Sequence, residues 1–498
     1  MINKSLNIFS PELIFLSIIG LIIASWNKIP NCNPISLGFD EQSFLFWKHV
    51  RSLDLIPFKD FFYPYGLLFY LKIDDSLWLT ISIVLVVVSI GSIFLFFRNI
   101  FEDRLYTYTF FLAFCLFVGA FLGFDSFLRY SPIIFVAYVA STLTYRGVIL
   151  NKIPALLIGL TLGLLFSLIN DLFFYSFFVS FSLTLFYLVF KHRKVDKKVF
   201  LFAAYSLFGF LIGAFPLLIY LNKNDALGSF VENYRLLKDI SIFAKVPFPP
   251  TLKSFENLFV IGTLIIFLLS LTSDVIWKKK KSFSFYLKLS LIIAIVFLEQ
   301  KNIVRSFYQQ LSFIGLIAFS FLANDFKKKL EQIKIQRKFI YFFVLNLLFL
   351  IFISIYLDRG LSLKKSFFQI NKINCNQIKL AEQNQLKLKK YEEVKRFLLT
   401  KKNPTIFSFP GDPIFYLLLD QKPPYYPSIY EATPLYAQEK MIEYIKSSKV
   451  NFVILNQKSS SIQDGVPDKI RGKLLYDYIS KNFVFDKKID SFLILRKK

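Results

Sequence analysis

Two adjacent carboxylates, Asp40 and Glu41, follow the first long apolar run of the chain, which ends near Trp26. Neighbouring residues on a helix point about 100° apart, so one carboxylate of such a pair can face a substrate while the fold holds the other. An ionised carboxylate within reach of a hydroxyl acts as a general base and accelerates its attack about 10²- to 10⁴-fold. The simpler alternative is that Asp40 caps a helix by accepting from backbone N–H groups of the first turn.

A second motif follows in the same segment, Pro57-Phe-Lys-Asp60-Phe-Phe-Tyr63-Pro64-Tyr65-Gly66. Together the two motifs resemble the GT-C superfamily of membrane glycosyltransferases, and within it bacterial relatives of the protein O-mannosyltransferase and aminoarabinose transferase families. Many of those relatives carry Pro-Tyr-Arg-Asp-Phe and then Tyr-Pro-Tyr-Gly-Pro at this place. Leu67 stands where the last proline of that pattern is expected, a departure that should alter a turn more than the chemistry.

The resemblance implies an inverting transfer of a sugar from a polyprenyl-phosphate carrier to an acceptor on the outer face of a bacterial cytoplasmic membrane. Asp40 would be the catalytic base, and Glu41 would position Asp40 or the acceptor. Asp60, Tyr63 and Tyr65 would bind substrate. Some members of the superfamily use a divalent cation and others do not, so the cofactor is left open. The sugar is also left open, as is the acceptor, which could be a lipid, a glycan or a protein.

The leaving group of such a reaction is a lipid phosphate, whose charge needs cations in a poorly hydrated place. Arg129 and Arg305 fall at the outer ends of apolar runs, and relatives often have an arginine at each place. The second arginine of the relatives is followed by an acid and a histidine, which Phe307 and Gln310 replace here, and Gln310 remains a candidate for substrate binding. The simpler alternative is that each arginine extends to the membrane interface.

Asp171 lies between two apolar runs that are joined by almost no loop. A carboxylate at membrane depth is a functional candidate, and relatives often have an aspartate there; the alternative is a turn residue exposed to water. The only histidines are His49 and His192, and neither supports a metal site. His49 could instead face the acceptor.

The elements that must position these residues are predicted to be membrane-spanning helices. The chain is 55% hydrophobic with a mean hydropathy of +0.51, in long runs rather than periodic stripes. A helix needs about 20 residues to cross the hydrocarbon core, and this length predicts a bundle of roughly eleven spans over a transmembrane domain 1–357. The predicted spans are Leu6–Trp26, Ser76–Phe97, Tyr106–Phe124, Tyr130–Tyr145, Ile153–Ile169, Leu172–Phe190, Val199–Leu221, Phe255–Trp277, Phe283–Leu298, Ile303–Ala323 and Phe339–Leu357.

The net charge of +26 comes from 60 Lys and Arg against 34 Asp and Glu. The Lys and Arg residues cluster in short connections such as Lys191–Lys198 and Lys327–Lys338. Short loops rich in Lys and Arg stay on the inner side of a membrane. This rule predicts an inner N-terminus and an outer C-terminal domain, and it explains the charge without a nucleic-acid partner. Two long connections, Asn27–Asp75 and Asn222–Ser254, then lie outside.

The last part of the chain, 358–498, is predicted to be a small extracytoplasmic α/β domain. Helical and strand-like segments alternate from Tyr391 onward, including strands at Thr405–Phe409 and Asn451–Leu455. The loop Pro423–Pro427 is rich in tyrosine and proline, and it either lines an acceptor groove or packs the core of this domain. No Gly-x-Gly-x-x-Gly or Walker sequence indicates a nucleotide site.

Two other kinds of protein remain open at this point. In a transporter or a flippase for lipid-linked sugars, Asp125, Asp171 and the arginines would line a path across the bilayer. The absence of an internal repeat weakens this alternative. The other kind is an assembly protein without catalytic activity, in which Asp40 is only a helix cap.

Overall fold

The computed structural model describes residues 46–63 except 48, 88–101 except 89, parts of 107–114, 123–193 except 169, 196–233, parts of 265–272, 283–305, parts of 320–325, 389–427, 433–457 and 467–498. Contacts divide the chain into two compact units. Unit 1 comprises Met1–Pro30, Gly66–Leu217 and Thr251–Asn371, and unit 2 comprises Asn31–Tyr65, Leu218–Pro250 and Lys372–Lys498. Parts of both long connections predicted to be external therefore belong to the same unit as the C-terminal segment.

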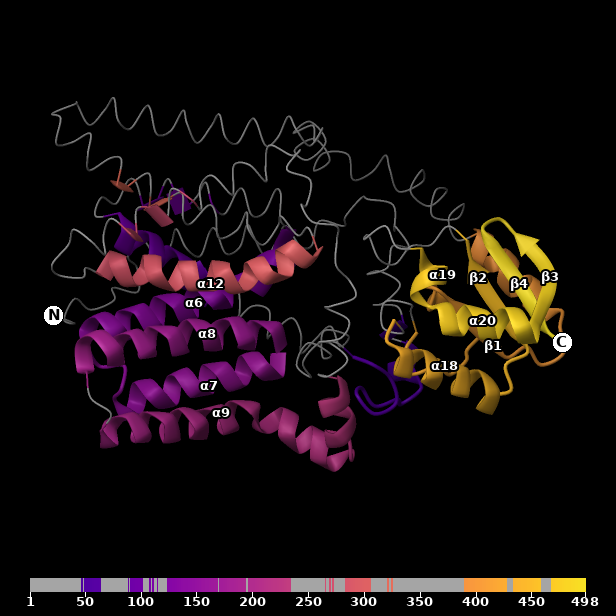
Figure 1. Ribbon diagram of the computed structural model, residues 1–498, viewed down its shortest axis with the longest axis horizontal. Helices are drawn as coiled ribbons and strands as arrows, with labels where there is room; N and C mark the ends of the chain where they lie inside the picture. The colour runs from indigo at the N-terminus through magenta and orange to yellow at the C-terminus, as the bar shows by residue number, and fades with distance from the viewer. Residues whose placement is uncertain are drawn as a thin grey trace, which may run out of the picture. The chain divides into compact units, whose positions relative to one another are not determined.

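Unit 1 is a bundle of helices that run alongside one another (Figure 1). Its main described helices are α6 (Gly123–Arg146), α7 (Lys152–Leu168), α8 (Asn170–Tyr187), α12 (Phe283–Arg305) and α9 (Lys197–Lys223), of which the part up to Leu217 belongs to unit 1. The short π-helix η3 (Leu188–His192) directly follows α8. Leu172–His192 and Lys197–Lys223 are long and apolar enough to cross a membrane, and three further described helices are apolar but shorter. A mostly helical chain with membrane-spanning candidates is confirmed; the described residues do not establish the predicted number of spans.

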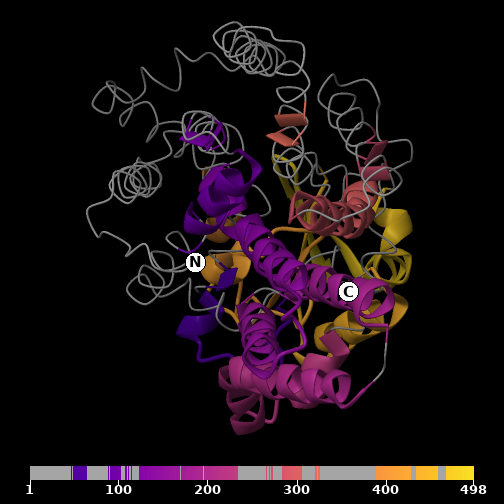
Figure 2. The same cartoon turned by 90° about the vertical axis from the view of Figure 1, so that its left-hand side faces the viewer.

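Contacts between the helices fix their relative directions. Ser141 Oγ, near the end of α6, donates to the carbonyl oxygen of Tyr286, near the start of α12, over 3.1 Å. The ring of Phe186, near the end of α8, lies 5.7 Å from that of Phe285 and 6.1 Å from that of Tyr286. α6 and α8 therefore run in one direction and α12 runs in the other. Figure 2 shows the same helices from the left-hand side of Figure 1.

Helices α7 and α9 approach each other through two matching Gly-x-x-x-Gly motifs, Gly159 to Gly163 and Gly209 to Gly213. A Cβ atom on Gly159 would lie 1.9 Å from the carbonyl oxygen of Ser206, and one on Gly213 would lie 2.4 Å from that of Leu160. No side chain fits in such a gap, so glycine is required for this contact. Small residues at this spacing allow close backbone packing between membrane helices.

Helix α12 differs from its prediction. The sequence predicts one span that ends at Leu298 and another that begins at Ile303, whereas α12 continues unbroken to Arg305. The intervening residues include Glu299, Gln300 and Lys301. These side chains are polar but favour helix, so hydropathy falls at this point without ending the hydrogen-bonded helix.

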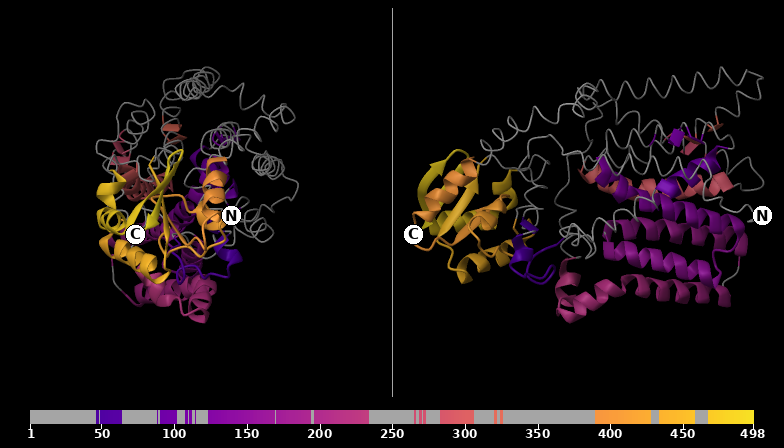
Figure 3. Two further views of the ribbon diagram at one scale, coloured as in Figure 1. Left: turned by 90° about the vertical axis from the view of Figure 1, so that its right-hand side faces the viewer. Right: turned by 180° about the vertical axis from the view of Figure 1, so that it is seen from behind.

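The C-terminal part of unit 2 is built around a sheet of four strands in the order β1-β2-β4-β3. Strands β1 (Ile406–Phe409) and β2 (Phe452–Asn456) are parallel and are joined through α17 (Ile414–Leu418) and α18 (Leu435–Ser447). After α19 (Asp468–Arg471) and α20 (Lys473–Asn482), β3 (Phe483–Ile489) and β4 (Phe492–Lys497) form a hairpin whose second strand pairs antiparallel with β2. The predicted small α/β fold is confirmed, and Figure 3 shows it from two sides.

Helices cover both faces of this sheet. On one face, Phe407 and Val453 belong to a core with residues of α18 and α20. On the other face, the rings of Tyr391, Phe415 and Phe492 lie 5.1 to 5.3 Å from one another and join the helix 389–399 and α17 to β4. The alternation of side chains along a strand produces these two apolar faces.

Candidate functional site

The predicted site residues are described to different extents. Asp40, Glu41, Tyr65 and Gln310 lie outside the described residues. Asp60 and Tyr63 are described in full and lie in unit 2. The backbones of Arg129, Asp171 and Arg305 lie in helices of unit 1, and their side chains are outside the description.

Asp60 closes the turn on which the second motif is built. Its Oδ2 accepts from the backbone N–H of Ile56 over 2.8 Å, and its own N–H donates to the carbonyl oxygen of Ile56 over 2.8 Å. The backbone N–H of Phe58 also donates to the carbonyl oxygen of Phe61 over 3.0 Å. One carboxylate oxygen of Asp60 thus takes part in the fold. If Asp60 binds substrate, it does so with a side chain that this hydrogen bond already holds in place.

Tyr63 lies in an aromatic cluster and not on an open surface. Its side chain is 1% exposed, and its ring centroid lies 5.2 Å from that of Trp47 and 5.8 Å from that of Phe58. The ring of Phe58 in turn lies 5.0 Å from that of Phe230. Trp47 and Val50 are also buried here. Burial of these apolar side chains stabilises the segment that follows the acidic pair.

The same segment contributes to the core of the C-terminal α/β fold. Phe62 is 2% exposed and belongs to the core formed with Phe407, Met441 and Leu475. Its backbone N–H donates to the carbonyl oxygen of Tyr425 over 2.9 Å. Residues far apart in the sequence therefore fold together, and of the two alternatives for the tyrosine-rich loop, this contact favours packing.

Tyr425 joins three segments of unit 2 through its hydroxyl group. This hydroxyl lies 2.6 Å from the carbonyl oxygen of Phe58 and 2.9 Å from Oδ1 of Asn233. A phenol carries one proton, so it cannot donate to two acceptors at once. With the Asn233 amide turned about its last bond, Nδ2 donates to the hydroxyl and the hydroxyl donates to Phe58, which also gives the buried Nδ2 a partner. Burial raises the pKa of Tyr425 well above its usual value, so it stays a donor at neutral pH.

His49 is attached to the same α/β fold. Its ring is 3% exposed, and Nε2 lies 3.1 Å from the carbonyl oxygen of Gln421. Because a carbonyl only accepts, Nε2 must carry the proton. The side chain of Gln421 accepts from the backbone N–H of Ile406 over 3.0 Å and donates to the carbonyl oxygen of Pro404. This burial does not support the prediction that His49 faces an acceptor.

Arg129 and Asp171 are near the starts of α6 and α8, and Arg305 is at the end of α12. These three helix ends lie on the same side of the bundle. Because the end of α6 and the end of α8 meet the start of α12, the other ends of these helices also lie on a common side. At a rise of 1.5 Å per residue, Arg129 lies about 18 Å along α6 from Ser141. Arg305 lies about 28 Å along α12 from Tyr286. Asp171 is in the first turn of α8, on that same side.

An ion pair with a buried lysine was not predicted from the sequence. Lys288 of α12 is 1% exposed, and its Nζ lies 2.6 Å from Oδ2 of Asp325, which is part-exposed. The cation also lies 5.9 Å from the centre of the Phe321 ring. A lysine inside an apolar run was a detectable signal, since a charge at that position requires a partner. Its partner could not be identified without the packing of α12.

Among the described residues, no group of three or more His, Cys, Asp or Glu side chains could hold a metal ion. Asp40 and Glu41 lie outside that part of the chain. No protein-family model matches the chain, and a search of the curated proteins finds no match to it. The functional assignment therefore depends on the motifs and on the contacts described above.

Proposed function

We propose that this chain is a membrane glycosyltransferase that moves a sugar from a polyprenyl-phosphate carrier to an acceptor outside the cytoplasm. Its fold would be GT-C-like, with about eleven spans, an inner N-terminus and an outer C-terminal α/β domain. The observation that carries the proposal is the common side of the helix ends bearing Arg129, Asp171 and Arg305. Two arginines and an aspartate carried on one side of a bundle suit a charged donor group.

In the proposed reaction, the acceptor oxygen attacks the anomeric carbon of the sugar. The bond from that carbon to the carrier phosphate oxygen breaks on the opposite face, so the configuration inverts. Asp40 takes the proton of the acceptor hydroxyl, and the phosphate leaves with the bonding electron pair. Arg129 and Arg305 would stabilise the charge on that phosphate. Asp171 and Glu41 would orient the acceptor or the base, and Gln310 and Tyr65 would bind substrate.

The packing of unit 2 supports a preorganised acceptor side. The segment after the acidic pair has a closed turn at Asp60, a buried ring at Tyr63 and a hydrogen bond from Tyr425 to Phe58. Catalytic carboxylates need positions held to within a fraction of an ångström, which a folded support provides more readily than a free loop. The relative directions of α6, α8 and α12 also agree with the proposed alternation of spans.

The test is release of labelled sugar from a panel of polyprenyl-phosphate sugars by the full chain in detergent, with an extract of membrane acceptors. Arg305→Gln should lower transfer at least tenfold because the leaving phosphate loses a cation. Arg496→Gln removes an equal charge from an exposed position of strand β4 and should leave transfer unchanged. Equal transfer by wild type and Arg305→Gln would contradict the role of the arginine, and absence of transfer across the panel would contradict the function.

The second candidate is transport or flipping of a lipid-linked sugar, and the pair formed by Lys288 and Asp325 favours it. A buried charge pair on membrane helices is typical of ion and substrate paths. An assay with the protein in lipid vesicles distinguishes the two candidates. A transporter moves the intact donor between leaflets and leaves its sugar–phosphate bond unbroken. Transfer with bond cleavage supports the enzyme, whereas movement without cleavage supports the transporter.

A further inference from the structure

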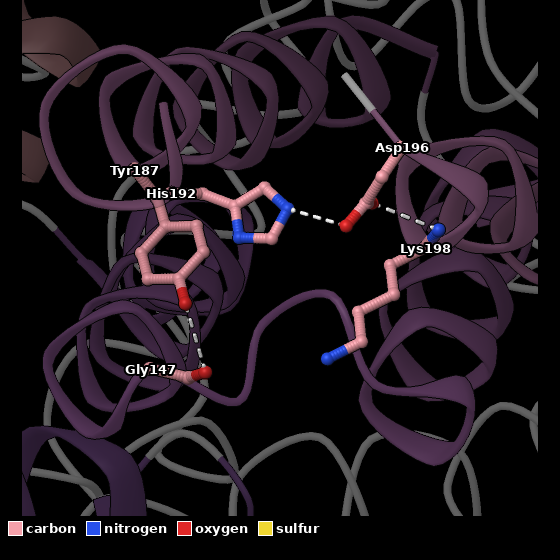
Figure 4. A network of polar contacts seen from close by, with 5 residues as sticks. All are labelled: Gly147, Tyr187, His192, Asp196 and Lys198. Carbon is pink, nitrogen blue, oxygen red and sulfur yellow. Dashed lines mark hydrogen bonds and ion pairs between the residues drawn. The ribbon is translucent and has the colours of Figure 1, made fainter. Parts of the chain in front are cut away.

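Four helix termini lie near one another at one end of unit 1. α6 ends at Arg146, α7 begins at Lys152, η3 ends at His192 and α9 begins at Lys197. The hydroxyl of Tyr187 donates to the carbonyl oxygen of Gly147 over 3.1 Å and thereby ties the π-helical end of the α8 segment to the turn after α6. Figure 4 shows this contact beside the pair formed by His192 and Asp196.

Exposed cations surround this end, and we refer to them as the basic rim. The described members are Arg146, Lys152, Lys191, Arg193, Lys197 and Lys198. The acid next to them is Asp196, whose Oδ2 lies 3.1 Å from Nε2 of His192 and whose Oδ1 accepts from the backbone N–H of Lys198 over 3.0 Å. Desolvation raises the pKa of Asp196, but these hydrogen bonds lower it, and the net pKa lies below the usual value. Asp196 therefore stays ionised and engaged in its own loop.

The cations of the basic rim are left available for an anion. Lys191 Nζ donates to the carbonyl oxygen of Tyr145 over 3.1 Å and lies 5.7 Å from the centre of the Tyr187 ring, so it is fixed without being neutralised. The Lys198 ammonium points away from the Asp196 carboxylate (Figure 4). Within the described part of the chain, none of the six rim cations is in an ion pair with an acid.

Large apolar side chains are exposed within one turn of the same cations. Phe190 is 61% exposed and Val189 is 56% exposed, just before Lys191, and Phe200 is 69% exposed just after Lys198. The rim also lies between two helices that are long and apolar enough to cross a membrane, one ending at His192 and the other starting at Lys197. Cations beside exposed apolar rings at the ends of membrane helices match a molecule with an anionic head and hydrocarbon tails.

We propose that the basic rim binds the phosphate headgroup of an anionic phospholipid. Lys191, Arg193 and Lys198 are assigned to the headgroup, and Phe190 and Phe200 to its acyl chains. The exposed apolar rings select a lipid over free phosphate, because a soluble anion gains nothing from them. This binding does not depend on the proposed sugar transfer.

The experiment is native mass spectrometry of the full chain in detergent, titrated with phosphatidylglycerol, phosphatidylcholine or inorganic phosphate. Tight binding of phosphatidylglycerol to wild type is expected, with much weaker binding of phosphatidylcholine. The combined variant Lys191→Gln, Arg193→Gln, Lys198→Gln should weaken it on the order of 100-fold, since each cation near a membrane surface contributes about fivefold.

The matched control is Lys473→Gln, Lys481→Gln, Lys488→Gln, which removes the same charge from exposed positions of the α/β fold. It should bind phosphatidylglycerol like wild type, and thermal unfolding of both combined variants shows that they are folded. Equal weakening by the control would overturn the site, because net charge alone would explain binding. Equal affinity for the two phospholipids, or displacement of phosphatidylglycerol by equimolar inorganic phosphate, would overturn the assignment of its ligand.

Discussion

The hydroxyl of Tyr425 lies 2.6 Å from the carbonyl oxygen of Phe58, to which it donates, although 367 positions separate the two residues in the sequence. Phe58 is in the motif Pro57 to Gly66, and Tyr425 is in the tyrosine-rich loop of the α/β fold. Phe62 extends the same contact into the hydrophobic core. The C-terminal fold thereby supports the segment that follows the acidic pair, which gives this fold a role in the proposed enzyme.

Tyr425→Phe should destabilise unit 2 by about 1–3 kcal/mol, because the buried carbonyl of Phe58 loses its donor. In the proposed enzyme, Tyr425→Phe should also lower the rate of sugar transfer, because the base Asp40 lies just before the segment that contains Phe58. Thermal unfolding in detergent and transfer from a polyprenyl-phosphate sugar measure the two effects.

Tyr478→Phe is the matched control, since it also removes one phenolic hydroxyl, and no hydrogen bond of that hydroxyl is recorded among the described residues. Its unfolding temperature should stay near that of wild type. Equal stability of Tyr425→Phe and wild type would show that the contact with Phe58 contributes nothing to holding the segment.

Gly159→Ala should push α7 and α9 apart, because its Cβ would lie 1.9 Å from the carbonyl oxygen of Ser206. Overpacking of this kind costs about 1–3 kcal/mol, and a backbone contact that cannot yield places it at the upper end. Gly91→Ala, in a described helix with no atom within 4 Å of the added Cβ, should be neutral or slightly stabilising. The temperature at which the detergent-purified protein aggregates distinguishes them, and similar values would rule out close packing of α7 on α9.

A double-mutant cycle on Lys288 and Asp325 should reveal strong coupling. Asp325→Asn takes the negative charge away from a lysine that is 1% exposed, at a cost of about 3 kcal/mol or more. Lys288→Met with Asp325→Asn should cost less than the sum of the single changes, because no buried charge remains. Unfolding of the four proteins gives the coupling energy, and additive losses would mean that the pair contributes no interaction.

High pH should destabilise the α/β fold through partly buried tyrosines such as Tyr444. Burial raises the pKa of Tyr444 to about 12, and a hydrogen bond with Ser448 acts in the opposite direction. The folded state therefore holds the phenolic proton more tightly than the unfolded state, whose pKa is about 10. The stabilising contribution is complete below about pH 10 and is lost as the pH rises through about 12. Tyr444→Phe should flatten this decline in unfolding free energy, and an unchanged slope would contradict the predicted ionisation.

Much of the fold could be predicted because its signals are local. The predicted strands Thr405–Phe409 and Asn451–Leu455 match β1 and β2 to within about two residues. Hydropathy found the apolar helices, but it placed a break after Leu298 where α12 continues. The close contact of α7 with α9 was encoded in the spacing of four glycines, a signal that hydropathy does not contain.

The candidate site was harder to predict, because its support is not local. The family resemblance suggested substrate contacts for Asp60 and Tyr63, and these roles stay predictions. The structure adds that Asp60 closes a turn and that Tyr63 lies in an aromatic cluster, neither of which the motif indicates. Tyr425 and Asn233 come from segments with no sequence link to this motif, so only the packing of unit 2 relates them to it. Arg129 and Arg305 were selected from family resemblance, and their roles remain predictions.

The most direct test of the central claim compares wild type with Asp40→Asn in transfer of labelled sugar from a polyprenyl-phosphate carrier. Asparagine keeps the size of the side chain and can still accept hydrogen bonds as a helix cap, but it cannot take the acceptor proton at neutral pH. The account predicts transfer by wild type and a loss of at least 10²-fold in Asp40→Asn, with an unchanged unfolding temperature. Equal transfer by the two proteins would contradict the assignment of Asp40 as the base.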